Sequence, residues 1–178
     1  MIKILLSRFR CYRATRLRQR MSAQERHRHD VEQEIIALRA RGTIIGEGCY
    51  ISGVSIMHGD PVSIGNRCVL TRCTILAHDA SPALFVQELD DEDLLKRRSL
   101  VKPTRILDNC FIGVGAIVLC GITVGPDSIV AAGAIVTKNV PEGVIVAGNP
   151  ARIIGTIERY AKAHLEQFQS NSALYPEP

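Results

Sequence analysis

A small aliphatic residue returns at every sixth position in one stretch of this chain, and no other feature constrains the fold as strongly. The positions are Ile106, Ile112, Val118, Val124, Val130 and Val136. A six-residue period fits neither the 3.6-residue period of a helix nor the simple alternation of a half-buried strand. It is typical of parallel β-helices, in which each six supplies one strand and one turn and three sixes close a triangular coil. We therefore expect these side chains to point inward and to stack on their counterparts eighteen residues later.

The fifth place of each repeat is mostly small, and several of the six cysteines fall in it. The small residues are Cys110, Ala116, Ser128 and Ala134, and Cys49 and Cys68 hold the same place in earlier repeats. The chain contains no C-x-x-C pair. This spacing predicts reduced, structural thiols where the coils crowd one another, and it requires neither disulfides nor zinc.

Earlier repeats begin at Ile45 and Ile51 and resume, after an irregular link at 57–61, at Ile64, Leu70 and Leu76. The period then stops between residues 79 and 105, where an acidic run (90–93) precedes a basic one (96–98). A connection of this length is usually functional or disordered. We expect residues 79–105 to form an arm that projects from the stack between two coils. The arm would contain a short helix near 88–98 or would be a solvated insertion.

Residues 1–41 carry eleven Lys or Arg against four acidic residues, although the whole chain has a formal charge of only +4. Ser22 followed by Glu25 predicts a capping box, with a helix running to Arg41 and ending at Gly42. Before it, apolar residues recur at helical spacing among arginines. This segment is interpreted either as a helical cap packed on a coil or subunit, which we prefer, or as an amphipathic foot in which residues 1–20 rest on anionic membrane.

The chain is thus expected to divide into a basic helical segment (1–41), a β-helix (42–155) with the extruded loop 79–105, and a short C-terminal helix and tail (156–178). No apolar run is long enough to span a bilayer, and the arginine-rich start is unlike a secretory signal. We expect a cytoplasmic protein. If residues 1–20 rest on membrane, it would lie peripherally at the inner membrane face. No nucleic-acid motif accompanies the basic charge.

Several phrases resemble those of the hexapeptide-repeat acyltransferases, and among them the galactoside- and maltose-type sugar O-acetyltransferases and the sugar acetyltransferases of surface polysaccharides. The phrases are DPVSIG at 60–65, ILDNCFIG at 106–113, GITVG at 121–125, VTK at 136–138 and GNPAR at 148–152. Together they cover roughly residues 45–155. The resemblance implies an all-β fold, the left-handed parallel β-helix, assembled as a homotrimer with acetyl-CoA in a groove between neighbouring subunits.

The resemblance also implies a catalytic residue, His78, which ends a repeat where the long arm departs. An imidazole suits the task because it can accept a proton from a sugar hydroxyl or amine near neutral pH. The acceptor would then attack the acetyl thioester directly, and backbone N–H groups would stabilise the oxyanion. By motif position, the coenzyme contacts are Val114, Ala132, Thr137, Lys138 and Arg152.

For the acceptor, the candidate contacts are His58, Asp60 and Asp79. Sugar acetyltransferases commonly have an Asp where this chain has His58, so we expect an acceptor other than a simple glycoside. Whether transfer is to oxygen or nitrogen, and whether the sugar is nucleotide-linked or part of a surface polysaccharide, is left open by the sequence.

Other functions fit the sequence less well. A γ-class carbonic anhydrase shares the fold but needs three histidines for its metal, and only two fall within the coils, so no metal is expected. Serine acetyltransferase has a much larger helical N-terminal domain. A non-enzymatic trimeric scaffold is the alternative from a different class, but it would need neither a base at the arm nor cations after the last coils.

Overall fold

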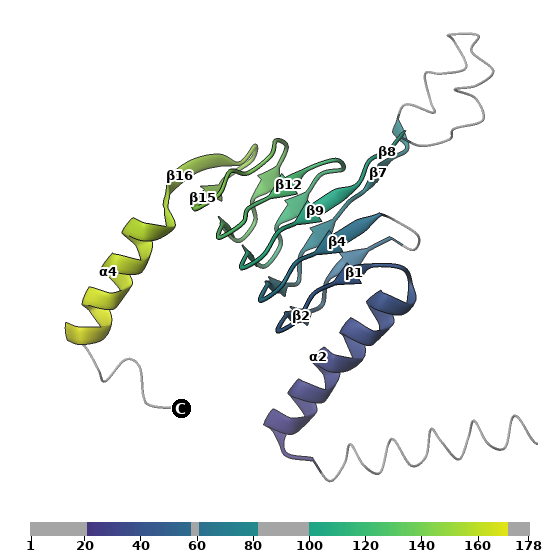
Figure 1. The fold of residues 1–178 in the computed structure, drawn as a ribbon, viewed down its shortest axis with the longest axis horizontal. Coiled ribbons are helices and arrows are strands. Elements are labelled where there is room, and N and C mark those ends of the chain that lie inside the picture. The colour runs from purple at the N-terminus through teal and green to yellow at the C-terminus, as the bar shows by residue number, and fades with distance from the viewer. Residues whose placement is uncertain (1–20, 58–60, 82–99, 171–178) are drawn as a thin grey trace, which may run out of the picture.

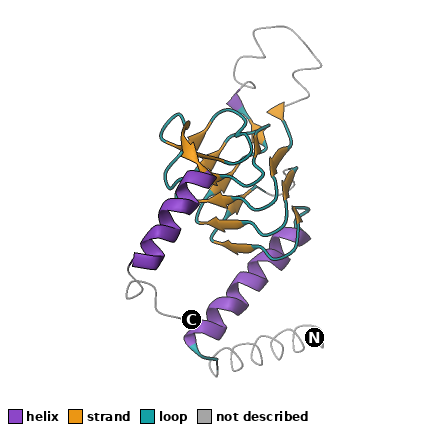
Figure 2. Cartoon of the chain, turned by 60° about the vertical axis from the view of Figure 1, so that its left-hand side comes forward, coloured by secondary structure: helices purple, strands orange, loops and turns teal. Residues whose placement is uncertain are grey.

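The computed structural model describes residues 21–57, 61–81 and 100–170, with side chains described as far as residue 165. Its centre is a stack of triangular coils whose walls are three parallel sheets (Figures 1 and 2). Sheet A contains β1 (Ile44–Ile45), β4 (Val62–Ile64), β9 (Thr104–Ile106) and β12 (Thr123–Val124), in that order. Sheet C contains β3 (Ser55–Ile56), β6 (Thr74–Ile75), β11 (Ile117–Val118) and β14 (Ile135–Val136).

Sheet B is the third wall, and it ends in the one antiparallel pairing of the three walls as far as they are described. Its strands are β2 (Tyr50–Ser52), β5 (Val69–Thr71), β10 (Phe111–Ile112), β13 (Ile129–Val130), β15 (Val144–Ala147) and β16 (Arg152–Thr156). Two further short strands, β7 (His78–Asp79) and β8 (Leu100–Val101), pair with each other outside the walls.

The six aliphatic residues of the regular period form the core, as predicted. Each is at most 1% exposed. They stack eighteen residues apart in the predicted register, so that Ile106 pairs with Val124 and Val118 with Val136. Complete burial of one such side chain stabilises the fold by about 1.5–3 kcal/mol. The core is therefore a column of small aliphatic side chains, which explains why the chain needs so few aromatic residues.

One assignment in the earlier repeats was wrong. The residue that faces the core after Leu70 is Ile75, which is fully buried, and Leu76 is only half-buried. The reason is a shorter corner between sheets B and C. Three residues connect the paired positions Leu70 and Thr74, whereas four connect Ile112 and Ile117 in the next coil. A strict six-residue count therefore overshoots by one.

The predicted helix after Ser22 is present as α2 (Ala23–Ala40). The Ser22 hydroxyl accepts from the backbone N–H of Glu25 at 3.2 Å, and the Glu25 carboxylate accepts from the Ser22 N–H at 2.7 Å. The helix ends at Ala40 with Arg41 as its C-cap, and Gly42 takes a φ of 102° that favours glycine. The capping box and the end of the helix are confirmed.

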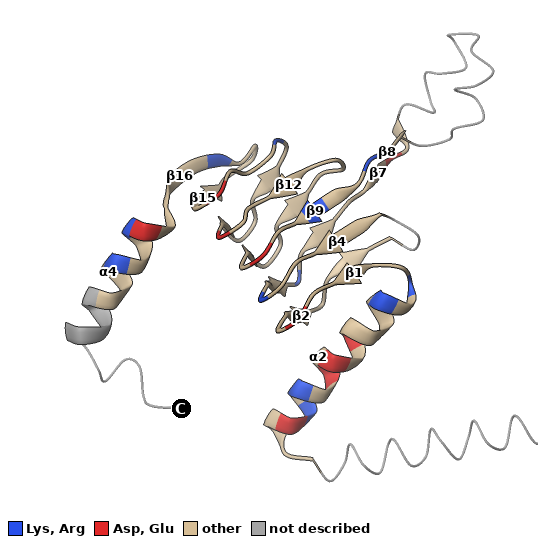
Figure 3. Ribbon diagram, in the orientation of Figure 1, with Lys and Arg blue, Asp and Glu red and all other residues tan. Residues whose placement is uncertain are grey.

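α2 packs across the first coil, and its charges are balanced along its length (Figure 3). The Glu34 carboxylate accepts from the N–H groups of Gly53 and Val54, both at 2.8 Å. Arg39 donates to the carbonyls of Ile45 and Gly46 at 2.8 and 3.0 Å. This part of the N-terminal segment behaves as a cap on the coil, and the net charge of the segment comes from residues 1–20.

At the other end of the stack, α4 (Ile157–Ser170) follows β16 and runs away from the coils (Figure 1). It confirms the predicted C-terminal helix. The proposed foot at residues 1–20 and the helix considered near 88–98 lie outside the described residues.

Candidate functional site

His78 lies where the chain leaves the stack of coils. Leu76 still belongs to the wall, since its N–H donates to the carbonyl of Val118 at 2.9 Å. His78 then pairs with Val101 in the antiparallel β7–β8 pair, which projects from the coils (Figure 1). The imidazole is half-buried. The predicted base therefore stands at the root of the arm, on a short ribbon anchored to sheet C.

Next to it, Asp79 is an exposed carboxylate with a local partner. Its Oδ1 accepts from the backbone N–H of Ser81 at 2.9 Å. The hydrogen bonds from Ser81, together with the nearby His78, lower the pKa of Asp79 below its usual value. A negative charge therefore persists beside His78 across the neutral range. His58 and Asp60, the other two candidate acceptor contacts, lie outside the described residues.

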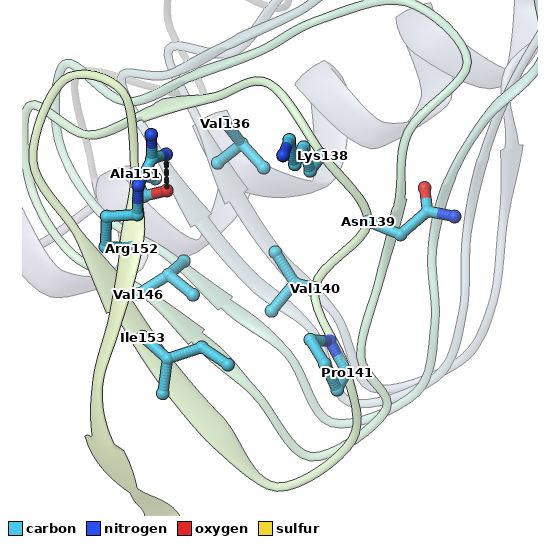
Figure 4. A pocket seen from close by; sticks show the side chains of 9 residues that line it. All are labelled: Val136, Lys138, Asn139, Val140, Pro141, Val146, Ala151, Arg152 and Ile153. Atoms are coloured by element: carbon cyan, nitrogen blue, oxygen red, sulfur yellow. Dashed lines mark hydrogen bonds between the residues drawn. The ribbon is translucent and has the colours of Figure 1, made fainter.

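Lys138 and Arg152 line the same pocket, a cavity of about 410 Å³ at the far end of sheet C (Figure 4). Its lining is Val136, Lys138, Asn139, Val140, Pro141, Val146, Ala151, Arg152 and Ile153. Both cationic side chains are exposed, and Arg152 donates to the carbonyl of Ala151 at 2.9 Å. The pocket thus combines an apolar wall with two positive charges, an arrangement suited to an anionic ligand with an apolar part.

Sequence reasoning did not select Asn139, which gives the pocket part of its shape. Its Oδ1 accepts from the backbone N–H of Thr123 at 2.9 Å, in the neighbouring coil. The amide therefore ties the corner after sheet C to sheet A. The sequence did contain a signal for Asn139, which is a polar residue directly after the VTK phrase at 136–138.

Val114 and Ala132 lie at the opposite corner of sheet C, one above the other. The carbonyl of Val114 accepts from the N–H of Gly133 at 2.9 Å, and both residues are exposed. The coils touch closely here, because a Cβ on Gly113 would lie 2.6 Å from the backbone nitrogen of Ala132. Val114 and Ala132 are therefore exposed at the corner where the chain enters sheet C. Thr137 and Lys138 lie at the corner where it leaves the last strand of that sheet.

The described candidates border one wall of the stack. In sheet C, Ile75 pairs with Val118 and Val118 with Val136, so the chain exits at the same corner after each of them. His78 and Lys138 leave from that corner two coils apart. Because neighbouring strands lie about 4.8 Å apart, this is a separation of roughly 10 Å along the stack. The structure therefore places the predicted base, His78, and the cationic side chain of Lys138 along one edge.

The buried cysteines are poor nucleophiles. Burial raises the pKa of the Cys68 and Cys73 thiols to about 12. The Cys68 thiol also donates to the carbonyl of Leu107 at 3.0 Å, in the next coil. All five cysteines within the described ranges are free thiols. Cys49, Cys68 and Cys110 donate to carbonyls of the next coil.

Within residues 21–57, 61–81 and 100–170, no group of three or more His, Cys, Asp or Glu side chains is arranged to hold a metal ion. Over the same part of the chain, none of the helices combines the length and apolar character needed to cross a membrane.

Comparisons with known proteins identify the repeat and the fold. Residues 103–138 match the family model described as the hexapeptide repeat of succinyl-transferase. A Saccharomyces cerevisiae protein, provisionally assigned as an acetyltransferase, is 31% identical over 64% of this chain and 55% of its own length. A 2,3,4,5-tetrahydropyridine-2,6-dicarboxylate N-acetyltransferase of Clostridium perfringens is 44% identical over 36% of this chain and 27% of its own length. The chain thus matches about half or less of these curated relatives.

Solved structures give the same result for the architecture. The hexapeptide-repeat acetyltransferase of Vibrio cholerae superimposes with a TM-score of 0.55 and 26% identity, over 65% of this chain and 62% of that protein. It has also been solved with acetyl coenzyme A. A maltose O-acetyltransferase of Clostridium difficile has the same fold, with a TM-score of 0.51 and 24% identity over 86% of this chain and 87% of its own.

The fold and the repeat together define the class. The chain is a left-handed parallel β-helix of hexapeptide repeats, as its sequence phrases implied. Within that class, the resemblance to the hexapeptide-repeat acyltransferases is confirmed, including the likeness in fold to an enzyme of the maltose type.

Proposed function

We propose that this protein is an acetyl-CoA-dependent acetyltransferase that transfers acetyl to a hydroxyl or amino group of a sugar, with His78 as the general base. The observation that carries the proposal is the shared edge of sheet C. It has an imidazole at the root of the arm and, two coils further along, an apolar pocket with Lys138 and Arg152. The complex of the Vibrio cholerae relative with acetyl coenzyme A supports the choice of donor.

The coenzyme would contact both corners of sheet C. Lys138 and Arg152 would bind the phosphates of its nucleotide end, because charge-assisted hydrogen bonds are the strongest available there. Thr137 would add a hydroxyl to the same end. Val114 and Ala132 would offer backbone groups to the amides of the pantetheine arm, much as a sheet edge binds an extended peptide.

The chemistry proposed for His78 is a direct transfer. Its neutral imidazole accepts the proton of the acceptor hydroxyl or amine as the acceptor forms a bond to the acetyl carbon. The oxyanion is stabilised by backbone N–H groups at a coil corner. When the carbon–sulfur bond breaks, the imidazolium returns the proton to the departing thiolate of coenzyme A. No covalent enzyme intermediate is needed, in keeping with the high pKa of the buried thiols.

For the acceptor we propose a sugar of a surface polysaccharide or of a nucleotide-sugar precursor, contacted by His58, Asp60 and Asp79. The persistent charge of Asp79 suits a donor group such as a sugar hydroxyl or an ammonium. Transfer to nitrogen receives separate support from the Clostridium perfringens relative, whose name specifies an N-acetyltransferase. The match to that relative covers only about a quarter of its length, so an amine-bearing dicarboxylate belongs in the acceptor panel beside the amino sugars.

We further propose that the active form is a homotrimer with the coenzyme between subunits. The exposed apolar side chains of Val114 and Phe111, 51% and 40% exposed, are consistent with surfaces that another subunit covers. Sedimentation velocity should then give a mass three times that of the chain. A cytoplasmic location, with residues 1–20 in peripheral contact with the anionic inner face of the membrane, stays a prediction. Co-sedimentation with anionic vesicles would test it.

The proposal is tested by His78→Ala, assayed as thiol release from acetyl-CoA with a panel of amino-sugar nucleotides, glycosides and amine-bearing dicarboxylates. We expect turnover to fall by about 10²–10⁴-fold, the usual contribution of a general base. Binding of acetyl-CoA should stay within twofold, because His78 stands two coils from the pocket. His164→Ala is the matched control, since it removes an exposed imidazole from α4. Equal turnover by wild type and His78→Ala would end the mechanism.

The donor site has its own test. Lys138→Ala and Arg152→Ala should each weaken acetyl-CoA binding about tenfold in calorimetry, whereas Lys162→Ala on α4 should not. If neither pocket variant weakens binding, the coenzyme lies elsewhere. If wild type binds no acetyl-CoA at all, the scaffold alternative replaces the enzyme.

A further inference from the structure

Thr104 places a hydroxyl in a mostly apolar core, where Thr43 and Ser128 are the other buried polar residues among those described. It is the first residue of β9, directly after the arm returns, and it alternates with the exposed Arg105 so that Thr104 and Ile106 both face inward. Its side chain is fully buried. A buried hydroxyl is costly unless it is hydrogen-bonded, so its partners indicate what it does.

Both partners lie at the root of the arm. The Thr104 Oγ1 donates to the carbonyl of Leu76 at 2.6 Å, and it accepts from the backbone N–H of Gly121 at 3.1 Å. One hydroxyl therefore joins the last wall residue before the arm, the first wall residue after it, and the corresponding corner of the next coil.

The three residues that lead into the arm are each held by the strand that returns from it. The Leu76 carbonyl is bound by Thr104, the Ala77 carbonyl accepts from the N–H of Lys102 at 2.8 Å, and His78 pairs with Val101. The stem of Lys102 also covers Gly121, where an added Cβ would lie 2.9 Å from the Lys102 Cδ. The two chain segments at the root of the arm are therefore bonded to each other where they meet sheet C. The contact made by Thr104 is the innermost of these.

We infer that Thr104 is a positioning residue that fixes the direction in which His78 leaves the coil. This rests on the proposed role of His78 as the base. The orientation of the Leu76 carbonyl sets the peptide plane two residues before His78. Without the hydroxyl, that carbonyl and the Gly121 N–H would both lose a buried partner, and the backbone would move to satisfy them. A displacement of about 1 Å at a catalytic group can cost on the order of 10²-fold in rate.

The test compares Thr104→Val, which keeps the shape and removes the hydroxyl, with Thr104→Ser, which keeps the hydroxyl. Thr104→Val should lower kcat about 10- to 100-fold with the KM for acetyl-CoA within twofold, and Thr104→Ser should recover most of kcat. Thr71→Val is the matched control. It removes a hydroxyl that bonds to the carbonyl of Ile112 at 3.4 Å, on the neighbouring corner. Loss of kcat that serine does not restore would overturn the role of the hydroxyl.

A second readout does not depend on the acceptor. The ring resonances of His78 in a ¹H–¹³C NMR spectrum, assigned with His78→Ala, should shift in Thr104→Val and stay in place in Thr71→Val. The Gly121 amide should exchange faster in the same variant. If His78→Ala proves fully active, the proposed function fails, yet shifted His78 resonances would still support the positioning role. Unmoved resonances together with full kcat in Thr104→Val would overturn the inference, whether or not His78 is the base.

Discussion

At the scale of single residues, the closeness of the coils sets what each corner tolerates. Gly113 has an ordinary φ, but a Cβ there would press on the backbone of Ala132 in the next coil. Backbone cannot move aside as a flexible side chain can. The coils near the proposed pantetheine contacts are therefore held at backbone contact distance by the absence of a side chain.

We expect Gly113→Ala to lower the free energy of unfolding by about 1–3 kcal/mol, the usual cost of overpacking. Gly155→Ala is the control, because a Cβ at Gly155 meets nothing within 4 Å. It should change stability by no more than about 0.5 kcal/mol. Urea unfolding of the two variants measures the difference, and equal values would show that the corner relaxes freely.

Asp108 links two coils through a carboxylate at an exposed corner. It accepts from the backbone N–H of Asn66 at 2.8 Å and from the Asn66 side chain at 3.2 Å. These bonds, the backbone one first, hold the pKa of Asp108 below its usual value. A group whose pKa is lowered by folding stabilises the protein above its unfolded pKa of about 3.9, and that stabilisation is lost as pH falls through the lower folded value.

The melting temperature of wild type should therefore fall more steeply below about pH 4 than that of Asp108→Asn, which cannot ionise. Above that pH, wild type should be the more stable of the two, because its charged acceptor bonds more strongly to Asn66. Melting curves from pH 2.5 to 7 make the comparison, with Glu142→Gln as an exposed control. Parallel curves would mean that the Asn66 bonds contribute nothing to stability.

The sequence was sufficient to predict which residues face the core wherever the period is regular. It failed at Leu76 because the number of residues in a corner is set by how successive coils pair, and single positions do not reveal it. It also missed Thr104. A threonine two places before Ile106 occupies the small-residue slot, and the slot alone does not tell which carbonyl the hydroxyl meets. The roles of the site residues, His78 included, stay predictions.

At the scale of elements, α2 combines a local feature with a non-local one. The capping box is local and was predicted from two residues. The contact that orients the helix is not local, because Glu34 reaches Gly53 and Val54 about twenty residues later. No pattern in the sequence pairs these positions. Helix formation could thus be predicted, and helix docking could not.

Glu34→Ala should loosen α2 by about 1–3 kcal/mol, the value of hydrogen bonds to a charged group. The expected result is faster exchange of the Gly53 and Val54 amides in native-state hydrogen exchange, with sheet C unchanged. Glu32→Ala removes an exposed carboxylate from the same helix and should have no such effect. If both variants exchange alike, the Glu34 contact does not hold the helix.

At the scale of the whole molecule, stability follows from stacking. Each coil contacts only its neighbours, so the fold is close to one-dimensional, as in other solenoids. Ile112 lies in a central coil, fully buried, between Leu70 and Val130. The core at this point belongs to three coils at once.

Ile112→Ala should lower the free energy of unfolding by about 2–5 kcal/mol, and Ile112→Val by about 0.5–1.5 kcal/mol. Chemical denaturation followed by circular dichroism gives both values. Ile112→Ala measures the cost of a large cavity. Ile112→Val shows whether the cost scales with the volume removed. Equal losses would contradict a close-packed column.

A stack of parallel coils has no intrinsic length, since every coil ends in the same open strand edges that received the previous one. Here each end is partly covered. At the first coil, Glu34 and Arg39 of α2 take up backbone donors and acceptors that another coil would use. At the last, β16 turns back to pair antiparallel with β15. Open edges of this kind are templates for edge-to-edge growth. The helix and the reversed strand therefore oppose the addition of further coils, and so keep the stack from growing into a fibre.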